Sequence, residues 1–213
     1  MSASDPKPAR SRSAGRPPRS AKQSAEMRLR VIEVARQLFE QQGFEAVSMR
    51  RIAAVAGCAP MSLYGYFRSK NEILRYVWEG IFAELFVLVR AAARRGTPAT
   101  RLRSASKAYL DYWLKHPDRY RAVFFNQDQT SDDERYYVDA SPVVERFEIF
   151  RELITAAQAA DQAWPQDPQV LGETLVCGLH GIALAAITIP EYSWASAEKM
   201  LDQLLRVVLS PQS

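Results

Sequence analysis

Apolar residues recur every three or four positions along most of this chain, and that spacing constrains its fold more than any other feature. Apolar residues at this period line one side of an α-helix, whereas a half-buried strand would alternate apolar and polar residues. No segment of the sequence alternates convincingly, and none repeats another. The sequence therefore predicts an all-α protein of about nine helices.

Capping residues, glycines and prolines mark where these helices begin and end. Ser48 and Gly57 bracket a short second helix, and Ser69 with Glu72 forms a capping box that begins a long fourth helix. Asp167-Pro168 begins a helix that is apolar nearly all round and runs to about Ile189. Four further helices are predicted from apolar positions that recur at helical spacing within residues 31–39, 102–113, 147–157 and 200–208. A short helix is expected at 118–125, and the polar, acidic residues 126–134 that follow it are expected to form a loop.

Composition and charge divide the chain into three parts. Residues 1–25 are rich in Ser, Pro, Ala, Lys and Arg without periodicity, which predicts a disordered basic arm. Residues 1–75 hold 14 Lys and Arg against 6 Asp and Glu, whereas residues 76–213 hold 14 against 18. Either the first part binds a polyanion or the basic tail is simply solvated. We expect a small helical domain over 26–87, with its motif at about 48–67, and a second over 88–213.

Several classes of protein are disfavoured. The longest apolar run, Ile182 to Ile189, is too short to span a bilayer, and no apolar segment follows the basic N-terminus as in a secretory signal. Cys58 and Cys177 have no metal-like spacing and suit a reducing cytoplasm. No pairing of nucleophile and base and no phosphate-binding glycine loop is present. The expectation is a soluble protein that is no enzyme and needs neither a metal nor a cofactor.

The segment Gly57 to Lys70, GCAPMSLYGYFRSK, carries the functional signal. Three short helices with a Gly-Cys-Ala link between the second and third describe a helix-turn-helix. Pro60 suits the first turn of the third helix, and Leu63 and Phe67 lie four residues apart, so both can face inward. The candidates for an outward-facing surface that touches DNA are Pro60, Met61, Ser62, Tyr64 and Tyr66. The alternative is that the two tyrosines are half-buried aromatics.

The run SMRRIAAVAGCAPMSLYGYFRSKNEIL, Ser48 to Leu74, resembles the DNA-binding domain of the tetracycline-repressor (TetR) family of regulators. The resemblance covers roughly residues 27–75, and the later helices agree in number and order with that family's regulatory domain. It implies that Arg50, with Arg51 beside it, reaches a base edge or phosphate. It also implies that Pro60, Met61 and Ser62 sit deepest in the major groove, while Tyr64, Tyr66 and Lys70 bind phosphates. The partner is then an operator with an inverted repeat.

Some residues depart from the family pattern. Ala59 stands where a Ser or Thr would cap the third helix, Gly65 is expected inside that helix, and Cys58 replaces the usual valine as a small core residue. Because Pro60 and Met61 at the tip of this helix offer few hydrogen-bonding groups, sequence choice is expected to depend on Arg50, on contacts with thymine methyl groups and on DNA shape. In the arm, Arg16 and Arg19 resemble arginines that enter a narrow minor groove.

The second domain offers candidates for dimerisation and ligand binding. The apolar helix from Leu171 to Ile189 contains Gly178, Gly181 and several alanines that permit close helix approach, either between two copies of the chain or inside one copy. Tyr109, Trp113, Phe124, Phe147 and His180 are candidates to line a pocket for an unidentified small-molecule effector. A packed, hydrogen-bonded role for His180 is the alternative.

These inferences predict a homodimeric, sequence-specific DNA-binding transcriptional regulator, acting as a repressor that a small molecule releases from DNA. The alternative is a basic-tailed helical protein that binds DNA or an anionic surface without sequence choice.

Overall fold

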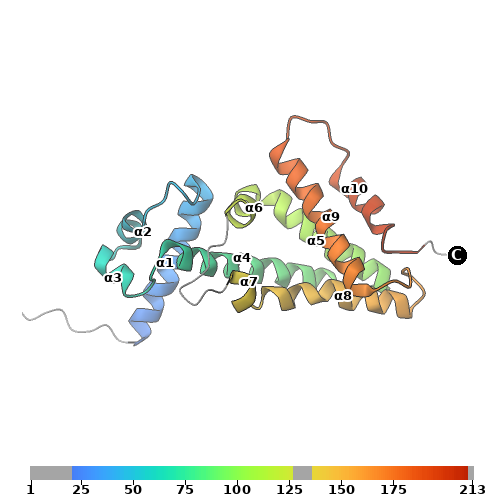
Figure 1. The fold of residues 1–213 in the computed structure, drawn as a ribbon, viewed down its shortest axis with the longest axis horizontal. Coiled ribbons are helices and arrows are strands. Elements are labelled where there is room, and N and C mark those ends of the chain that lie inside the picture. The colour runs from blue at the N-terminus through green and yellow to red at the C-terminus, as the bar shows by residue number, and fades with distance from the viewer. Residues whose placement is uncertain (1–20, 127–135, 211–213) are drawn as a thin grey trace, which may run out of the picture.

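The computed structural model describes residues 21–126 and 136–210, and these ranges contain ten helices. In order along the chain (Figure 1) they are α1 (Ala21–Gln42), α2 (Met49–Ala56), α3 (Pro60–Tyr64), α4 (Lys70–Ala92), α5 (Pro98–Lys115), α6 (Pro117–Phe124), α7 (Tyr137–Ala140), α8 (Val143–Ala159), α9 (Pro168–Thr188) and α10 (Ala197–Leu205). The predicted all-α class is confirmed. The additional helix is α7, which is too short to show a periodic pattern.

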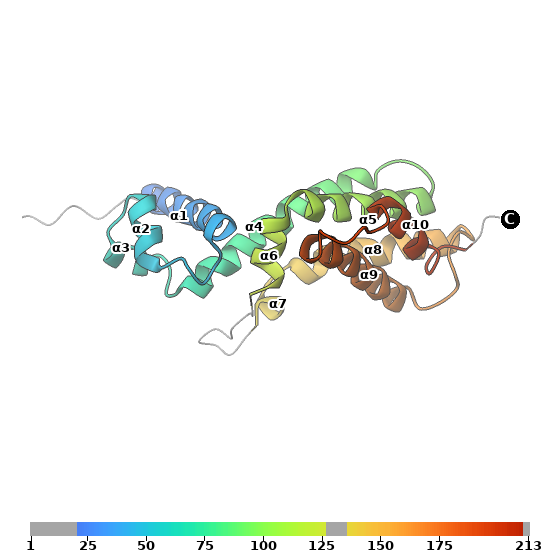
Figure 2. The ribbon, with the colours of Figure 1, turned by 90° about the horizontal axis from the view of Figure 1, so that it is seen from above.

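Helices α1, α2 and α3 pack together at one end of the molecule, and α4 runs from them into a bundle formed with α5 to α10 (Figures 1 and 2). The first half of α4 buries Ile73 and Leu74, and its second half buries Phe82, Leu85 and Phe86. The buried side chains form one continuous hydrophobic core. One helix therefore carries the core across the expected domain boundary at residues 87 and 88.

Local capping follows the sequence closely. The Ser48 hydroxyl accepts a hydrogen bond from the Arg51 N–H at 3.2 Å, and the Ser69 hydroxyl accepts one from the Glu72 N–H at 3.1 Å. Gly57 ends α2 with a φ of 75°, a left-handed conformation that favours glycine. The capping box differs from its usual form, because the Glu72 carboxylate accepts from the N–H of Arg68 rather than from that of Ser69.

Three boundaries differ from the prediction. Helix α1 already begins at Ala21, so residues 21–25 are helical and do not belong to the arm. Gly65 is the C-cap of α3 and not an interior residue, so it carries no helix-interior penalty. Helix α10 runs from Ala197 to Leu205, whereas the sequence predicts a last helix from about Ala195 to Leu209. Arg16 and Arg19, and most of the predicted loop at 126–134, lie outside the described residues.

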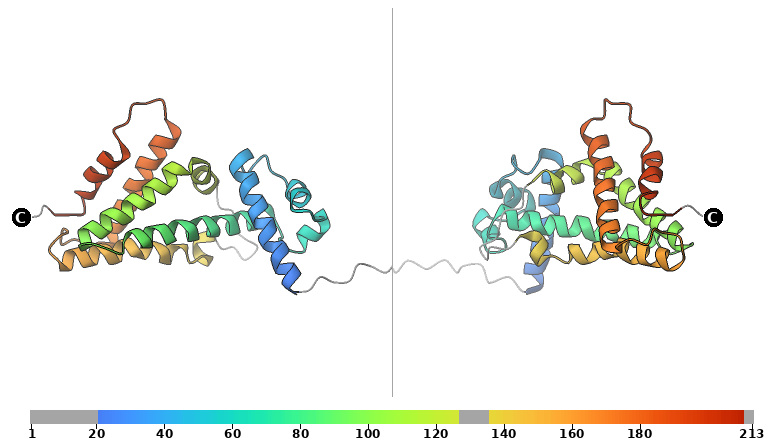
Figure 3. Two further views of the ribbon diagram at one scale, coloured as in Figure 1. Left: turned by 180° about the vertical axis from the view of Figure 1, so that it is seen from behind. Right: turned by 45° about the vertical axis from the view of Figure 1, so that its right-hand side comes forward.

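Helix α9 follows the predicted helix from Asp167-Pro168 to about Ile189 and is apolar along most of its length. By length and composition alone it is sufficient to cross a membrane, a test that buried helices of soluble proteins also pass. Only 33% of its most apolar part is buried within the chain. Helix α10 folds back beside it, as the views in Figure 3 show, yet Val170 and Leu184 stay 56% and 43% exposed. Much of the apolar surface of α9 is therefore left uncovered by a single chain.

Candidate nucleic-acid interface and ligand site

The α2–turn–α3 unit is held by side chains that point into the core. Leu63 and Phe67 are 0% and 1% exposed, which confirms their prediction as anchors. The turn follows the left-handed Gly57, and Cys58 packs against the core as a partly buried residue. Ala59 supplies no side-chain hydrogen bond at the start of α3, as predicted. Helix α3 is therefore positioned by two apolar side chains and a proline at its first turn.

The opposite face of α3 is open to solvent. Met61 is 83% exposed and Tyr64 is 53% exposed, and Pro60 and Ser62 are exposed beside them. Arg50 and Arg51, in the first turn of α2, are exposed as well. Met61 and Tyr64 therefore present apolar and hydroxyl groups that are accessible to another molecule. The structure thus places the predicted DNA-contacting residues of α2 and α3 on the surface of one small domain.

Tyr66 and Lys70 differ from the other candidates because the protein itself holds them. Tyr66 follows the end of α3 and is partly buried against the core. The Lys70 ammonium donates to the Phe44 carbonyl oxygen at 2.8 Å and lies 3.9 Å from the centre of the Phe44 ring. An ammonium has three protons, so this contact leaves Lys70 further donors at the N-terminus of α4. Its first role in the structure is to tie α4 to the segment that follows α1.

Arg28 of α1 is a positioning residue that the sequence patterns did not identify. Its guanidinium lies 4.4 Å from the ring centre of Phe67 and 4.7 Å from that of Tyr76. It also donates to the Tyr66 carbonyl oxygen and lies 3.7 Å from the Glu72 carboxylate. These contacts fasten the chain that leaves α3 to both α1 and α4. No sequence signal marks Arg28, because its partners lie almost forty or more positions away.

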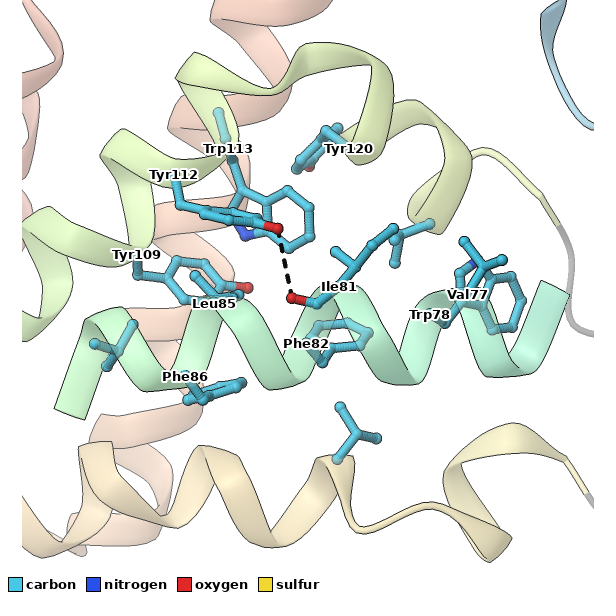
Figure 4. Close-up of a cluster of buried hydrophobic side chains, with 14 of the residues drawn as sticks. Val77, Trp78, Ile81, Phe82, Leu85, Phe86, Tyr109, Tyr112, Trp113 and Tyr120 are labelled. Carbon is cyan, nitrogen blue, oxygen red and sulfur yellow. Dashed lines mark hydrogen bonds between the residues drawn. The ribbon is translucent and has the colours of Figure 1, made fainter. Parts of the chain in front are cut away.

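The five candidate ligand residues of the second domain come together in one aromatic cluster. The ring centre of Trp113 lies 6.2 Å from that of Tyr109 and 5.2 Å from that of Phe124. The Phe147 ring lies 6.0 Å from that of Tyr109, and the His180 ring lies 4.5 Å from that of Phe124. Figure 4 shows how Tyr109, Tyr112 and Trp113 lie over the Ile81, Phe82 and Leu85 side of α4. Tyr109 and Trp113 are fully buried.

His180 is the polar centre of this cluster. The Tyr109 hydroxyl lies 2.7 Å from His180 Nε2, and the Tyr120 hydroxyl lies 3.4 Å from Nδ1 and donates to the His180 carbonyl oxygen at 3.3 Å. An imidazole that carries its proton on Nδ1 satisfies these contacts in its neutral form. Burial lowers the pKa of His180 to about 4, so the neutral form prevails at pH 7. His180 is therefore packed and hydrogen-bonded inside the chain, as one of the two alternatives from the sequence proposed.

A groove lies between α8 and α9, next to this cluster. It has a volume of about 310 Å³ and is lined mainly by apolar groups, among them Val144, Phe147, Phe150, Gly172 and Val176. Of the five predicted ligand residues, Phe147 alone lines this groove. The groove was not foreseen because its two walls come from segments that are separate in sequence. Its volume falls at the lower end of the range usual for small-molecule sites.

An ion-pair network joins the two domains. Arg119 of α6 lies 3.1 Å from the Glu40 carboxylate near the end of α1 and 2.8 Å from the Glu84 carboxylate of α4. It also donates to the Tyr112 hydroxyl of α5 at 2.8 Å. Glu40 is held in turn by Arg36 at 2.6 Å. Arg119 therefore connects four helices at the place where α6 meets α1.

In the part of the chain that the structure describes, no group of three or more His, Cys, Asp or Glu side chains is placed to hold a metal ion.

Two family models match the chain. The model for bacterial regulatory proteins of the tetR family matches residues 31–77. The model for the tetracyclin repressor-like C-terminal domain matches residues 102–208, about half of the chain. The first match contains α2 and α3 with their exposed residues, and the second contains the aromatic cluster, the α8–α9 groove and all of α10.

Individual proteins agree with these matches. An HTH-type transcriptional regulator of Staphylococcus aureus (strain USA300) is 39% identical over 56 residues, which are 26% of this chain and 30% of that protein. A transcriptional regulator of the TetR/AcrR family from Thermobifida fusca is 25% identical with a TM-score of 0.62, covering 85% of this chain and 96% of the other. A TetR family transcription regulator from Marinobacter aquaeolei shares the fold, with a TM-score of 0.66 at 15% identity over 90% and 100% of the two chains.

Proposed function

Since this chain belongs to the tetR family of bacterial regulatory proteins and is a DNA-binding transcriptional regulator, we propose that it is a homodimeric repressor that a small-molecule effector releases from its operator. Regulators of this family are DNA-binding proteins and not enzymes. The main support for the proposal is the exposed surface of α3 beside Arg50. Helix α4 and the Arg119 ion pairs connect this surface to a second domain that contains an apolar groove. We place the protein in the cytoplasm, where its operator is accessible.

We assign direct contacts with DNA to the exposed side chains of the first domain. Met61 and Pro60 offer apolar contact to thymine methyl groups in the major groove, and Ser62 and Tyr64 offer hydroxyls to phosphates. Arg50, with Arg51 beside it, reaches a guanine edge or a phosphate. Tyr66 and Lys70 act at the edge of this surface, Lys70 with the donors that Phe44 leaves free. Arg16 and Arg19 of the arm add affinity in the minor groove.

Dimerisation is supported by the uncovered side of α9. Exposed residues that are apolar or small at most places recur at three- and four-residue intervals along this side: Val170, Thr174, Cys177, Gly181, Leu184 and Thr188. Gln169 and Glu173, near the start of the helix, are exposed as well. A helix of this composition that is only one-third buried in its own chain needs a further apolar partner. A second copy of the chain supplies it through a two-fold axis, which also places two α3 helices on one inverted repeat.

The dimer is tested by measuring the mass in solution by light scattering. Wild-type protein is expected at twice the 24.1 kDa of one chain. Leu184→Glu adds a charge to the exposed side of α9 and is expected to shift the mass toward the monomer. Val87→Glu changes a residue of α4 that is 68% exposed and is the control. A wild-type monomer, or equal behaviour of both variants, argues against this interface.

The effector is proposed to bind in the α8–α9 groove. Phe147 and Phe150 line the groove and also contact the Tyr109 ring, at centroid distances of 6.0 and 5.8 Å. Tyr109 reaches His180 and, through Trp113 and Tyr120, helix α6. Arg119 of α6 then holds α1. A ligand that favours one arrangement of α8 thus changes the operator affinity by the coupling free energy, typically about 1–3 kcal/mol.

Two experiments separate the parts of this proposal. Genome-wide mapping of binding sites followed by footprinting is expected to show discrete protection of paired half-sites about one helical turn apart, or a multiple of it. Uniform coating of DNA would instead favour the alternative, a protein that binds DNA or an anionic surface without sequence choice. A reporter gene under the mapped operator distinguishes repression from activation.

For the effector, compounds are screened for release of labelled operator, measured by fluorescence anisotropy. Val176→Trp fills the groove and is expected to abolish release while operator binding persists. Ala159→Trp, exposed near the end of α8 and outside the groove, is the control. If no small molecule alters operator binding, the effector proposal fails and the DNA-binding function stands.

A further inference from the structure

The acidic second domain contains a local excess of arginine at the end of α4 that is farthest from α1 to α3. Residues 90–110 include five arginines and one lysine but no Asp or Glu. Arg103 pairs with Glu198 and Asp202 of α10, and Lys107 pairs with Asp111. Within the described part of the chain, no carboxylate pairs with Arg90 or Arg94, although residues 76–213 carry a net negative charge.

Arg90 and Arg94 open onto a pocket together with Arg101. The pocket has a volume of about 390 Å³ and lies between α4, the connection to α5, and α8. Arg101, from the first turns of α5, donates from Nε to the Ala93 carbonyl oxygen at 2.7 Å. That bond fixes the guanidinium against the chain that leaves α4 and leaves its other N–H groups available. Three arginines from two helices and their connection therefore line one pocket.

The opposite wall of the pocket is mainly apolar. It is formed by Ile149, Leu153 and Ala156 of α8, with the carboxylate of Glu152 as the one acidic lining group. Three arginines against one glutamate leave the pocket with two positive charges in excess. The α8–α9 groove is lined by a different face of α8, which includes Val144, Glu148 and Arg151.

We propose that this pocket binds a small amphiphilic oxyanion, a molecule with a carboxylate or phosphate head group and an apolar body. Guanidinium groups bind both head groups through paired hydrogen bonds, and the neighbouring positive charges favour an anion over a neutral group. The apolar body lies along Ile149, Leu153 and Ala156. The site is separate from the effector groove and does not depend on the proposed repressor function.

The test is calorimetric titration of the full-length protein with octyl phosphate, octanoate, octanol and inorganic phosphate, each below its aggregation limit. One of the two amphiphilic anions is expected to bind at least about tenfold more tightly than both octanol and inorganic phosphate. Whichever of octyl phosphate and octanoate binds more tightly identifies the head group that the pocket prefers. The double variant Arg90→Gln/Arg94→Gln is expected to weaken that binding at least about tenfold.

Arg95→Gln is the matched control, because Arg95 carries the same charge one position beyond Arg94, is exposed, and does not line the pocket. It is expected to bind the anion within about twofold of wild type. The proposal is overturned if the double variant binds as well as wild type, if Arg95→Gln loses as much affinity, or if octanol or inorganic phosphate binds as tightly as the tighter of the two amphiphilic anions. A thermal melt of each variant verifies that the surface substitutions leave the fold intact.

Discussion

Arg119 Nε lies 3.1 Å from the Glu40 carboxylate, so a residue of α6 in the second domain is paired with the last turn of α1 in the first. The two side chains are only 15% and 20% exposed, so solvent screens this pair less than it screens a surface pair. The contact joins residues 79 positions apart and links α1 of the first domain to α6 of the second.

Replacing Arg119 with Gln is therefore expected to lower the free energy of unfolding by about 1–2 kcal/mol, because Glu40 and Glu84 lose a shared partner. Denaturant unfolding monitored by circular dichroism measures this change. Lys107→Gln removes the exposed pair with Asp111 and is expected to change stability by less than about 0.5 kcal/mol. Equal effects of the two substitutions would contradict a special role for Arg119.

Arg50→Ala is expected to weaken operator binding by about 1–3 kcal/mol, since a lost base contact has that magnitude. Fluorescence anisotropy over a series of salt concentrations measures both the affinity and its salt dependence. An equal loss on operator and unrelated DNA, with a salt slope lower by about one, would instead assign Arg50 to a phosphate. Arg95→Ala, at the far end of the molecule, is expected to leave operator binding unchanged.

Ala59→Ser is expected to stabilise the protein by about 0.5–1 kcal/mol. Ala59 already has the extended backbone of an N-cap, with φ −68° and ψ 144°, but lacks an oxygen to accept a hydrogen bond from the first turn of α3. The thermal midpoint measures the gain. Ala54→Ser, exposed inside α2, introduces the same hydroxyl without a cap and is expected to be neutral or slightly destabilising. A similar gain at both positions would rule out a capping effect.

Gly178 and Gly181 form a matched pair on α9. A Cβ at Gly178 would clash with the side chain of Leu204, whereas a Cβ at Gly181 would meet nothing within 4 Å. Gly178→Ala is expected to cost about 1–3 kcal/mol by displacing Leu204 of α10. Gly181→Ala is expected to be neutral within the chain, or to stabilise it by up to about 1 kcal/mol through helix propensity.

Chemical unfolding of both glycine variants compares their free energies of unfolding. The double variant Gly178→Ala/Leu204→Ala tests whether a clash with Leu204 causes the loss. If the clash is responsible, Leu204→Ala lowers the free energy of unfolding less in the Gly178→Ala variant than in wild type. Additive costs would show that Gly178 acts in another way.

His180 is expected to make stability depend on pH. Its pKa is lowered by burial to about 4, below the ordinary value of 6.5, so the native state favours the neutral ring. The resulting stabilisation is fully present above pH 6.5 and is lost as the pH falls toward 4, because the unfolded chain then binds a proton that the native chain does not. The total loss is about 3 kcal/mol.

Urea unfolding at pH 7 and pH 5 measures this loss. His180→Gln keeps an acceptor for the Tyr109 hydroxyl but cannot titrate, so its stability is expected to fall less between the two pH values. A variant with the same pH dependence as wild type would show that other groups, such as the carboxylates, dominate.

Much of the fold was predictable because its determinants are local. Helix periodicity, the Ser48 and Ser69 caps, the Gly57 stop and the inward pair Leu63 and Phe67 depend on residues within about four positions of one another. The exposed face of α3 followed from that pair, since the side chains opposite two buried anchors must face outward. The position of Gly65 was misjudged because α3 ends after five residues, and nothing local marks that end.

Other features were decided only when the helices packed. Lys70 reaches Phe44, Arg28 reaches Phe67 and Tyr76, and Gly178 makes room for Leu204. The five ligand candidates lie in one cluster, but the α8–α9 groove beside them could not be predicted, because it forms only where α8 packs against α9. The sequence by itself determined which helices form and which faces they bury, because backbone hydrogen bonds and apolar periodicity act within a few residues. Tertiary structure alone decided which charged side chain pairs with which and which arginines stay unpaired, because those distances depend on how helices far apart in the chain are packed.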